Sequence, residues 1–202
     1  INKAMERAQK KVETRNFDIR KNLIKFDDVM NDQRQVIFSQ RLRILKNSNI
    51  EKILEDFIDE ISKNLDNIKS NYLKNKDNKS YLAALKNTTG NSLNDDDLLK
   101  FSSLSTPQFS EKIKDLFLFK RTERIKILGI EENNNLEKKI FLQIIDFTWR
   151  SHLQYLEQLR QVIGLRSYGQ KDPLSEFKKE AFALFENLLE KIKNDIIKFL
   201  LN

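Results

Sequence analysis

The sequence predicts an all-α protein: one long scaffold helix packed against an antiparallel two-helix hairpin, with a small helical insertion between them. The 202 residues contain only four Gly and two Pro, which leaves few of the turns that β hairpins require. Apolar residues recur at helical spacing over long segments. The last two of these segments are joined by a short loop that contains Gly, which is the pattern of an antiparallel helix pair.

Residues 2–45 are predicted to form one helix, because they contain neither Gly nor Pro. At about 1.5 Å per residue this helix is roughly 65 Å long. Eight apolar side chains fall within a sector of about 60° around its axis. They are Ala8, Val12, Ile19, Leu23, Phe26, Met30, Ile37 and Ile44.

A second apolar set lies on the opposite side of the same helix. Phe17, Ile24 and Leu42 point about 160° to 180° away from the first stripe. Two apolar stripes indicate an element with partners on both sides. The periodicity leaves open what these partners are. The sequence leaves open which stripe meets which partner, and it predicts that one side is under-packed in the chain alone.

Residues 47–135 are predicted to be a small helical insertion with its own core. Its first helix covers about 50–72, a polar loop follows at 75–79, and a short apolar piece covers 81–85. The segment 87–92 carries the strongest loop signal in the chain.

The rest of the insertion is organised by helix-start signals. Three adjacent acidic residues, Asp95 to Asp97, suit a helix N-terminus better than a cation site, because no calcium-loop spacing follows them. Ser105, Thr106 and Pro107 are typical of a helix start. Gly129 to Asn135 is predicted to interrupt the helical order.

Residues 136–202 are predicted to return to the scaffold and to form the hairpin, so that the domains are 1–46, 47–135 and 136–202. The hairpin loop covers about 164–173, where Asp172 caps the last helix and Pro173 opens it. The loop is expected to present Arg166, Tyr168 and Lys171 away from the hairpin core.

The excess positive charge lies on the first helix. Residues 1–46 contain 12 basic and 6 acidic side chains, against a net charge of +7 for the whole chain. This suggests an anionic partner, which would be an acidic protein face, a lipid surface or nucleic acid. Two alternatives to a protein-docking scaffold therefore stay open: a helical nucleic-acid-binding module and a coiled-coil adaptor. The acidic residues interspersed along this helix, such as Asp18 and Asp32, suit protein contacts better than nucleic acid.

The sequence offers no catalytic constellation. There is no phosphate-binding loop motif, no Cys, and only one His, His152, which is expected to be a packing or surface residue. Asp27 and Asp28 diverge by about 100° on a helix and form no facing acid–base pair. We therefore expect no catalytic, cofactor or metal site. No apolar run is long enough to span a membrane, no signal peptide opens the chain, and a start at Ile1 suggests excision from a longer protein.

Two groups of motifs resemble the SecA family, the ATP-driven motors of bacterial preprotein secretion. Near the N-terminus these are AQKKVETRNFDIRK from Ala8, FDDVMNDQR from Phe26 and SQR from Ser39. Near the C-terminus they are WRSHL from Trp149, LRQVIGLRSYGQKDP from Leu159 and FKKEAF from Phe177. They resemble the start of the family's helical scaffold and its two-helix finger, with residues 47–135 in the place of the helical wing.

The resemblance implies roles and partners. Asp18, Arg20 and Asp27 match polar contacts between scaffold and motor domains, and Tyr168, flanked by Arg166 and Lys171, matches the fingertip that touches the preprotein. Implied partners are the SecYEG channel, preproteins, an anionic membrane surface, and the nucleotide-binding and preprotein-crosslinking domains of a longer parent protein. The resemblance also implies that the C-terminal hairpin covers one apolar stripe of residues 2–45 and that domains outside this chain cover the other. Nucleic acid is not expected, and a homodimer stays open. ATP and magnesium belong to the parent and not to this segment, which should be inactive alone. The implied location is the cytoplasm, peripheral on the inner membrane.

Overall fold

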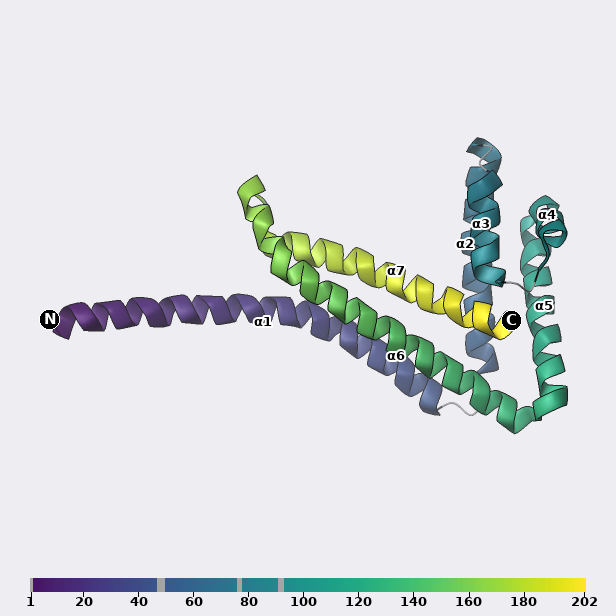
Figure 1. Ribbon diagram of the computed structural model, residues 1–202, viewed down its shortest axis with the longest axis horizontal. Coiled ribbons are helices and arrows are strands. Elements are labelled where there is room, and N and C mark those ends of the chain that lie inside the picture. The colour runs from purple at the N-terminus through teal and green to yellow at the C-terminus, as the bar shows by residue number, and fades with distance from the viewer. Residues whose placement is uncertain (1, 47–49, 76–77, 91–92) are drawn as a thin grey trace. The chain divides into compact units, whose positions relative to one another are not determined.

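The computed structural model describes residues 2–46, 50–75, 78–90 and 93–202, and within them it contains helices and no strand (Figure 1). The predicted all-α class is therefore confirmed. The elements are α1 (Asn2–Lys46), α2 (Glu51–Asn75), α3 (Asn78–Thr89), α4 (Asp95–Ser103), α5 (Thr106–Leu128), α6 (Ile130–Ile163), the 3₁₀ helix η1 (Gly164–Gly169) and α7 (Pro173–Leu201).

The chain folds as two compact units. Unit 1 comprises the chain up to Ser39 together with Trp149–Leu188, and unit 2 comprises Gln40–Thr148 together with Leu189–Asn202. The helices α1, α6 and α7 each contribute to both units. The unit boundaries therefore fall inside helices, whereas the boundaries predicted from the sequence fall after residues 46 and 135.

The core of unit 1 is built by three helices. Leu156, Leu159 and Ile163 of α6 pack with Phe177 and Ala181 of α7. The half-buried side chains that pack against this cluster are Phe26, Val29 and Met30 of α1 and Leu184 of α7. The rings of Phe26 and Phe177 meet edge to face with centroids 5.0 Å apart. Burial of aromatic side chains of this kind is the main source of stability in such a core.

The hairpin covers the first apolar stripe of α1, and it covers only part of it. The stripe becomes buried or half-buried at Phe26 and continues so through Met30 and Ile37. Every described residue from Asn2 to Lys25 is exposed, so the N-terminal half of the same stripe is not buried by the described residues of this chain.

The second stripe of α1 is not covered. Phe17, Ile24 and Leu42 are 59%, 58% and 49% exposed. The structure thus decides which stripe meets the hairpin, a question that the sequence left open. The under-packing is wider than the sequence indicated, because both stripes of α1 are exposed over residues 2–25.

Unit 2 is a helical cluster around α2. This helix packs against α3 and α5, and α3 packs against α4. Phe57 of α2 stacks on Phe141 of α6, with ring centroids 5.8 Å apart. Lys114 of α5 pairs with Asp59 of α2 at 2.6 Å, which holds the pKa of Lys114 above its ordinary value. Because α6 supplies Phe141, the core of the insertion is not confined to residues 47–135.

Two predicted loops are helical instead. The helix α6 starts at Ile130, so the interruption predicted for 129–135 is reduced to Gly129, whose φ of 83° is in the region that favours Gly. The loop predicted for 87–92 is helical through Thr89. The hydroxyls of Thr88 and Thr89 donate to the carbonyls of Ala84 and Leu85, which satisfies polar side chains inside a helix. Of the loop predicted for 75–79, residues 75 and 78–79 are helical. Residues 47–49, 76–77 and 91–92 lie outside the described residues.

The helix starts of the insertion agree with the sequence. The acidic run lies in the first turn of α4, where the helix dipole favours negative charge. Ser105 precedes α5, and its backbone N–H and its hydroxyl both donate to Oε1 of Gln108, at 3.3 and 2.9 Å. The bond from the Ser105 backbone N–H to the Gln108 side chain is one half of a capping box, whose other half joins the Ser105 side chain to the backbone of Gln108.

A buried ionic cluster joins α5 to α6 across Gly129. The carboxylate of Glu137 is fully buried, and it accepts from Arg121 Nε at 3.0 Å and from Arg124 Nη2 at 3.3 Å. Arg121 also pairs with Glu51 of α2 at 2.8 Å, and Arg124 donates to the carbonyl of Leu200 in α7. The cluster therefore ties four helices of unit 2 together.

Removing Glu137 should strongly destabilise unit 2. A Glu137→Leu substitution removes the carboxylate that the buried Arg121 and the half-buried Arg124 share, and loss of one partner of a buried ion pair costs about 3 to 5 kcal/mol. Urea unfolding followed by circular dichroism measures this loss. The control is Asp97→Asn, which breaks an exposed pair with Lys100 and should cost less than about 1 kcal/mol. Equal losses in the two variants would show that the buried cluster contributes little.

Candidate functional site

The hairpin ends in a short, tightly closed tip. After α6 the chain forms η1, and Gln170 then adopts a left-handed conformation with φ of 59°. The N–H of Gln170 donates to the Ser167 carbonyl at 3.1 Å, and the Ser167 hydroxyl donates to the Gly164 carbonyl at 2.6 Å. These bonds hold the turn without help from buried apolar side chains, since η1 contains no buried residue.

The return into α7 is capped. Oδ2 of Asp172 accepts from the Ser175 hydroxyl at 2.6 Å and from the Ser175 backbone N–H at 2.9 Å. These bonds to Ser175 hold the pKa of Asp172 below its ordinary value of 3.8. The predicted cap at Asp172 and helix start at Pro173 are both confirmed.

Tyr168 stands free at the tip, and its flanking cations do not. Tyr168 is 89% exposed. Arg166 Nη1 donates to Glu176 Oε2 at 3.0 Å, Lys171 Nζ donates to the same oxygen at 3.4 Å, and Arg166 also pairs with Glu180. The expected outward presentation therefore holds for the ring of Tyr168, while the two cations are folded back on α7.

The carboxylate of Glu176 is the centre of this arrangement. Desolvation acts to raise its pKa, but the hydrogen bond from Arg166 and the charge of Lys171 outweigh that effect and leave the pKa below its ordinary value. Glu176 thus stays ionised and neutralises part of the charge of the tip.

The three polar residues expected to contact motor domains are in different surroundings. Asp27 accepts from Arg160 Nη1 at 3.0 Å, and Arg160 also pairs with Glu157 at 2.9 Å. Asp18 and Arg20 lie on the exposed half of α1. Asp27 is therefore engaged within unit 1, and the structure does not bring the three residues together.

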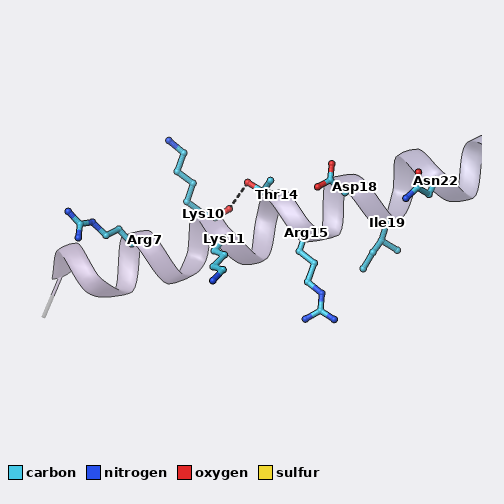
Figure 2. A pocket seen from close by; sticks show the side chains of 8 residues that line it. All are labelled: Arg7, Lys10, Lys11, Thr14, Arg15, Asp18, Ile19 and Asn22. Carbon is cyan, nitrogen blue, oxygen red and sulfur yellow. Dashed lines mark hydrogen bonds between the residues drawn. The ribbon is translucent and has the colours of Figure 1, made fainter. Parts of the chain in front are cut away.

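Asp18 lines a shallow groove along α1 that is predominantly basic (Figure 2). The eight lining residues are Arg7, Lys10, Lys11, Thr14, Arg15, Asp18, Ile19 and Asn22. Four of them are cations and one is an acid. Figure 2 shows Lys10 and Arg15 pointing to opposite sides of the helix, so the charge spreads around α1 instead of converging on one point.

Sequence reasoning missed a polar chain inside unit 1. Gln33 is 7% exposed, and its amide nitrogen donates to the Ala181 carbonyl at 3.0 Å. Its side-chain oxygen lies 2.8 Å from His152 Nε2, and the His152 ring lies near the rings of Trp149 and Phe185. His152 is a packing residue, as expected, but its partner could not be identified because Gln33 lies 119 positions away in the sequence.

No cluster of the described His, Cys, Asp and Glu residues could hold a metal ion. None of the described helices combines the length and the apolar character needed to cross a membrane. The candidate contact surfaces of the described residues are the exposed aromatic tip of the hairpin and the exposed N-terminal half of α1.

Comparisons with known proteins agree with the motifs at the two ends. The chain matches the family described as "SecA Wing and Scaffold domain" over residues 1–202. It belongs to this family. The match covers the middle of the chain as well as the two ends that carry the motifs.

Named relatives share the family. The chain is 54% identical over 202 residues to "Protein translocase subunit SecA" of Pelagibacter ubique, and the match covers all of this chain and 24% of the relative. The proteins of the same name from Bartonella bacilliformis and Hyphomonas neptunium are 40% and 36% identical over 205 residues, covering all of this chain and 22% of each relative. The chain thus spans about a quarter of the length of these SecA proteins.

The stability of unit 1 should depend on pH through His152. Burial lowers the pKa of His152 below its ordinary value of 6.5, so the unfolded chain binds the proton at higher pH than the folded chain does. The stabilisation is therefore fully present above about pH 6.5, and it is lost as the pH falls from there through the folded pKa. Urea unfolding at pH 7.5, 6.5 and 5.5, followed by the fluorescence of Trp149, should show the decrease.

The matched control for this pH dependence is His152→Gln, which keeps an N–H donor toward Gln33 and does not titrate. Between pH 7.5 and 5.5 the free energy of unfolding should decrease less in the variant than in the unmodified chain. The same loss in both chains would assign the pH dependence to other groups.

Proposed function

We propose that this chain is the scaffold, wing and finger segment of a protein-translocating ATPase, and that it couples motion of nucleotide-binding domains to a preprotein through the tip of the α6–α7 hairpin. Family membership supports the parent activity, and the single observation that supports the site is the free ring of Tyr168 at the end of the hairpin. ATP and magnesium act in the parent's other domains. The chemistry of this segment is contact and transmission of movement.

A tyrosine is suited to moving chains of any sequence. Its ring offers apolar contact to most side chains, and its hydroxyl donates to or accepts from a passing backbone. The pairing of Arg166 and Lys171 with Glu176 fits this role, because a tip with balanced charge neither retains acidic segments nor repels basic ones. Arg166 and Lys171 then act mainly by fixing the shape of the tip. Their side chains are partly exposed, and these exposed parts also contact the preprotein.

The bare half of α1 is the proposed surface for the parent's motor and preprotein-crosslinking domains. It carries two uncovered apolar stripes together with Asp18 and Arg20. An exposed helix with apolar stripes on opposite sides is typical of an element that is enclosed by neighbours. Asp27 would contribute to this surface with the oxygen that Arg160 does not use.

The remaining partners follow from the parent. A preprotein at the tip implies the SecYEG channel as the exit, and the channel implies a peripheral position on the cytoplasmic face of the inner membrane. The basic character of the groove on α1 supports an anionic neighbour, either an acidic protein face or the lipid surface. If the nucleic-acid alternative were correct, duplex DNA would bind the groove tightly at moderate salt, and its affinity would fall steeply as the salt concentration rises.

Crosslinking tests the tip. In the intact ATPase, Tyr168→Cys should crosslink to a preprotein arrested in the channel, because the side chain projects from the hairpin. Lys178→Cys, on the exposed side of α7, is the matched control and should crosslink much less. Absence of a Tyr168→Cys adduct, while a cysteine elsewhere on the translocation path reacts, would contradict the assignment.

Substitution tests why the tip is aromatic. Tyr168→Phe should retain most translocation, whereas Tyr168→Ala should reduce the rate about twofold to tenfold, as expected from loss of an aromatic contact. The measurement is translocation of one preprotein into membrane vesicles. Equal rates for the Ala and Phe variants would show that the ring makes no productive contact.

Charge reversal tests the face of α1. Arg20→Glu should weaken the complex between this chain and the parent's other domains supplied in trans, by about tenfold if Arg20 makes a desolvated ion pair. Lys178→Glu reverses a charge on the hairpin instead and should leave the affinity unchanged. Identical affinity for the Arg20→Glu variant and the unmodified chain would remove Arg20 from the contact face.

A further inference from the structure

The apolar stripe of α1 is a seven-residue repeat. One row contains Val12, Ile19, Phe26 and Gln33, each seven positions from the next. The second row contains Leu23, Met30, Ile37 and Ile44 at the same spacing. The rows are three and four residues apart, which is the seam of a helix that packs along a partner.

Such a seam does not by itself define where α1 sits on the hairpin. If α1 slid by seven residues, a translation of about 10 Å, Ile19 would take the place of Phe26 and Leu23 that of Met30. Both are available, because Ile19 and Leu23 are 49% and 44% exposed. Apolar groups would replace apolar groups, so burial alone hardly distinguishes the two positions.

Gln33 is the polar exception in the buried part of the seam. Its amide group donates to the carbonyl of Ala181 in α7, so its side-chain oxygen is left to accept the N–H of His152 Nε2 in α6. One side chain of α1 therefore satisfies groups on both helices of the hairpin. After a seven-residue slide Phe26 would face His152, whose N–H would be buried without an acceptor.

Two ion pairs between α1 and α6 are less able to select the position. Arg41 and Asp146 pair at 3.2 Å, but their side chains are 42% and 47% exposed, and after the slide Arg34 would take the place of Arg41. Asp27 and Arg160 pair at 3.0 Å, but the side chain of Asp27 is 57% exposed. Water and salt weaken such pairs. After the slide Arg20 would face Arg160, which is unfavourable yet easily relieved by two long side chains in solvent.

We propose that Gln33, through His152, is the positioning residue that fixes the axial position of α1 on the α6–α7 hairpin. A single polar group in an apolar seam sets register because only one alignment satisfies it. The inference concerns the packing of this chain and does not depend on the proposed function. Its consequence for that function is that Gln33 sets the distance between the exposed half of α1 and Tyr168.

Cysteine crosslinking tests the proposal in the full 202-residue chain, which has no native Cys to interfere. The reference pair is Asp27→Cys with Arg160→Cys, two positions whose side chains meet in this structure. The slid pair is Arg20→Cys with Arg160→Cys, which would meet only after a seven-residue slide. Both cysteine pairs remove the Asp27–Arg160 ion pair. A difference in crosslinking between the unmodified chain and a Gln33 variant is therefore due to Gln33.

With Gln33 present, a short bismaleimide should join the reference pair and leave the slid pair at background. In Gln33→Leu the slid pair should crosslink about tenfold more, as expected when one buried hydrogen-bonded group no longer selects the alignment. Gln35→Leu changes an exposed amide on the other side of α1 and should change nothing. His152→Gln keeps an N–H donor and should retain the reference pattern.

A double variant covers the case in which Gln33→Leu fails to fold. Gln33→Leu combined with His152→Leu removes both polar side chains, so neither of them is left buried without the other, and the circular dichroism of the double variant should be that of the unmodified chain. The slid pair should again crosslink in this background. If it stays at background in a folded Gln33→Leu chain or in the folded double variant, Gln33 does not set the register.

Discussion

The edge-to-face contact of Phe26 with Phe177 marks the point at which α1 begins to be held. Before it, the described residues of α1 are exposed, although Asn22 and Lys25 line a pocket with the end of α6 and the start of α7, and after it the helix is buried along one stripe. The hairpin needs this contact as well, because the α6–α7 cluster is completed by side chains from α1. The long scaffold helix and the finger are therefore one packing unit, and neither would keep its apolar residues covered alone.

Ion pairs join helices in both units of this chain. Arg121 and Glu137 connect α5 to α6 where only Gly129 separates them, and Arg166 and Glu176 close the tip of the hairpin. The first cluster is centred on the buried carboxylate of Glu137, so its loss removes the charge that offsets the buried Arg121 and the half-buried Arg124. The second is exposed, so it contributes shape and charge balance more than stability. The net positive charge of the protein is thus a poor guide to where its cations are free.

The sequence predicted the helical class, the main helices and the tip because these depend on local patterns. Spacing of three and four, the cap at Asp172 and the scarcity of Gly can all be seen within a few turns of the chain. Two helix boundaries failed for the same reason: Asn- and Thr-rich segments resemble loops, although Thr88 and Thr89 bond back to their own helix.

Long-range contacts could not be predicted in this way. Nothing near Gln33 indicates that His152 and Ala181 would meet it, and nothing near Glu137 indicates two arginines from α5. The resemblance implied a partner outside this chain for Asp27, and it gave no sign that Asp27 also pairs with Arg160 of the same chain. Such pairs are fixed by the tertiary fold, and one sequence contains no record of them.

The exposed half of α1 also acts as a lever, because it is a stiff helix that is held at one end. Residues 2–25 extend about 36 Å beyond the first packed turn at 1.5 Å per residue. A tilt of about 10° at Phe26 would carry the far end of a stiff helix of this length through roughly 6 Å. Shifts of less than one ångström among the rings around Phe177 thus become displacements as large as a side chain at Met5. Conversely, a partner bound at the far end of α1 could shift the packing of the hairpin core by moving that end.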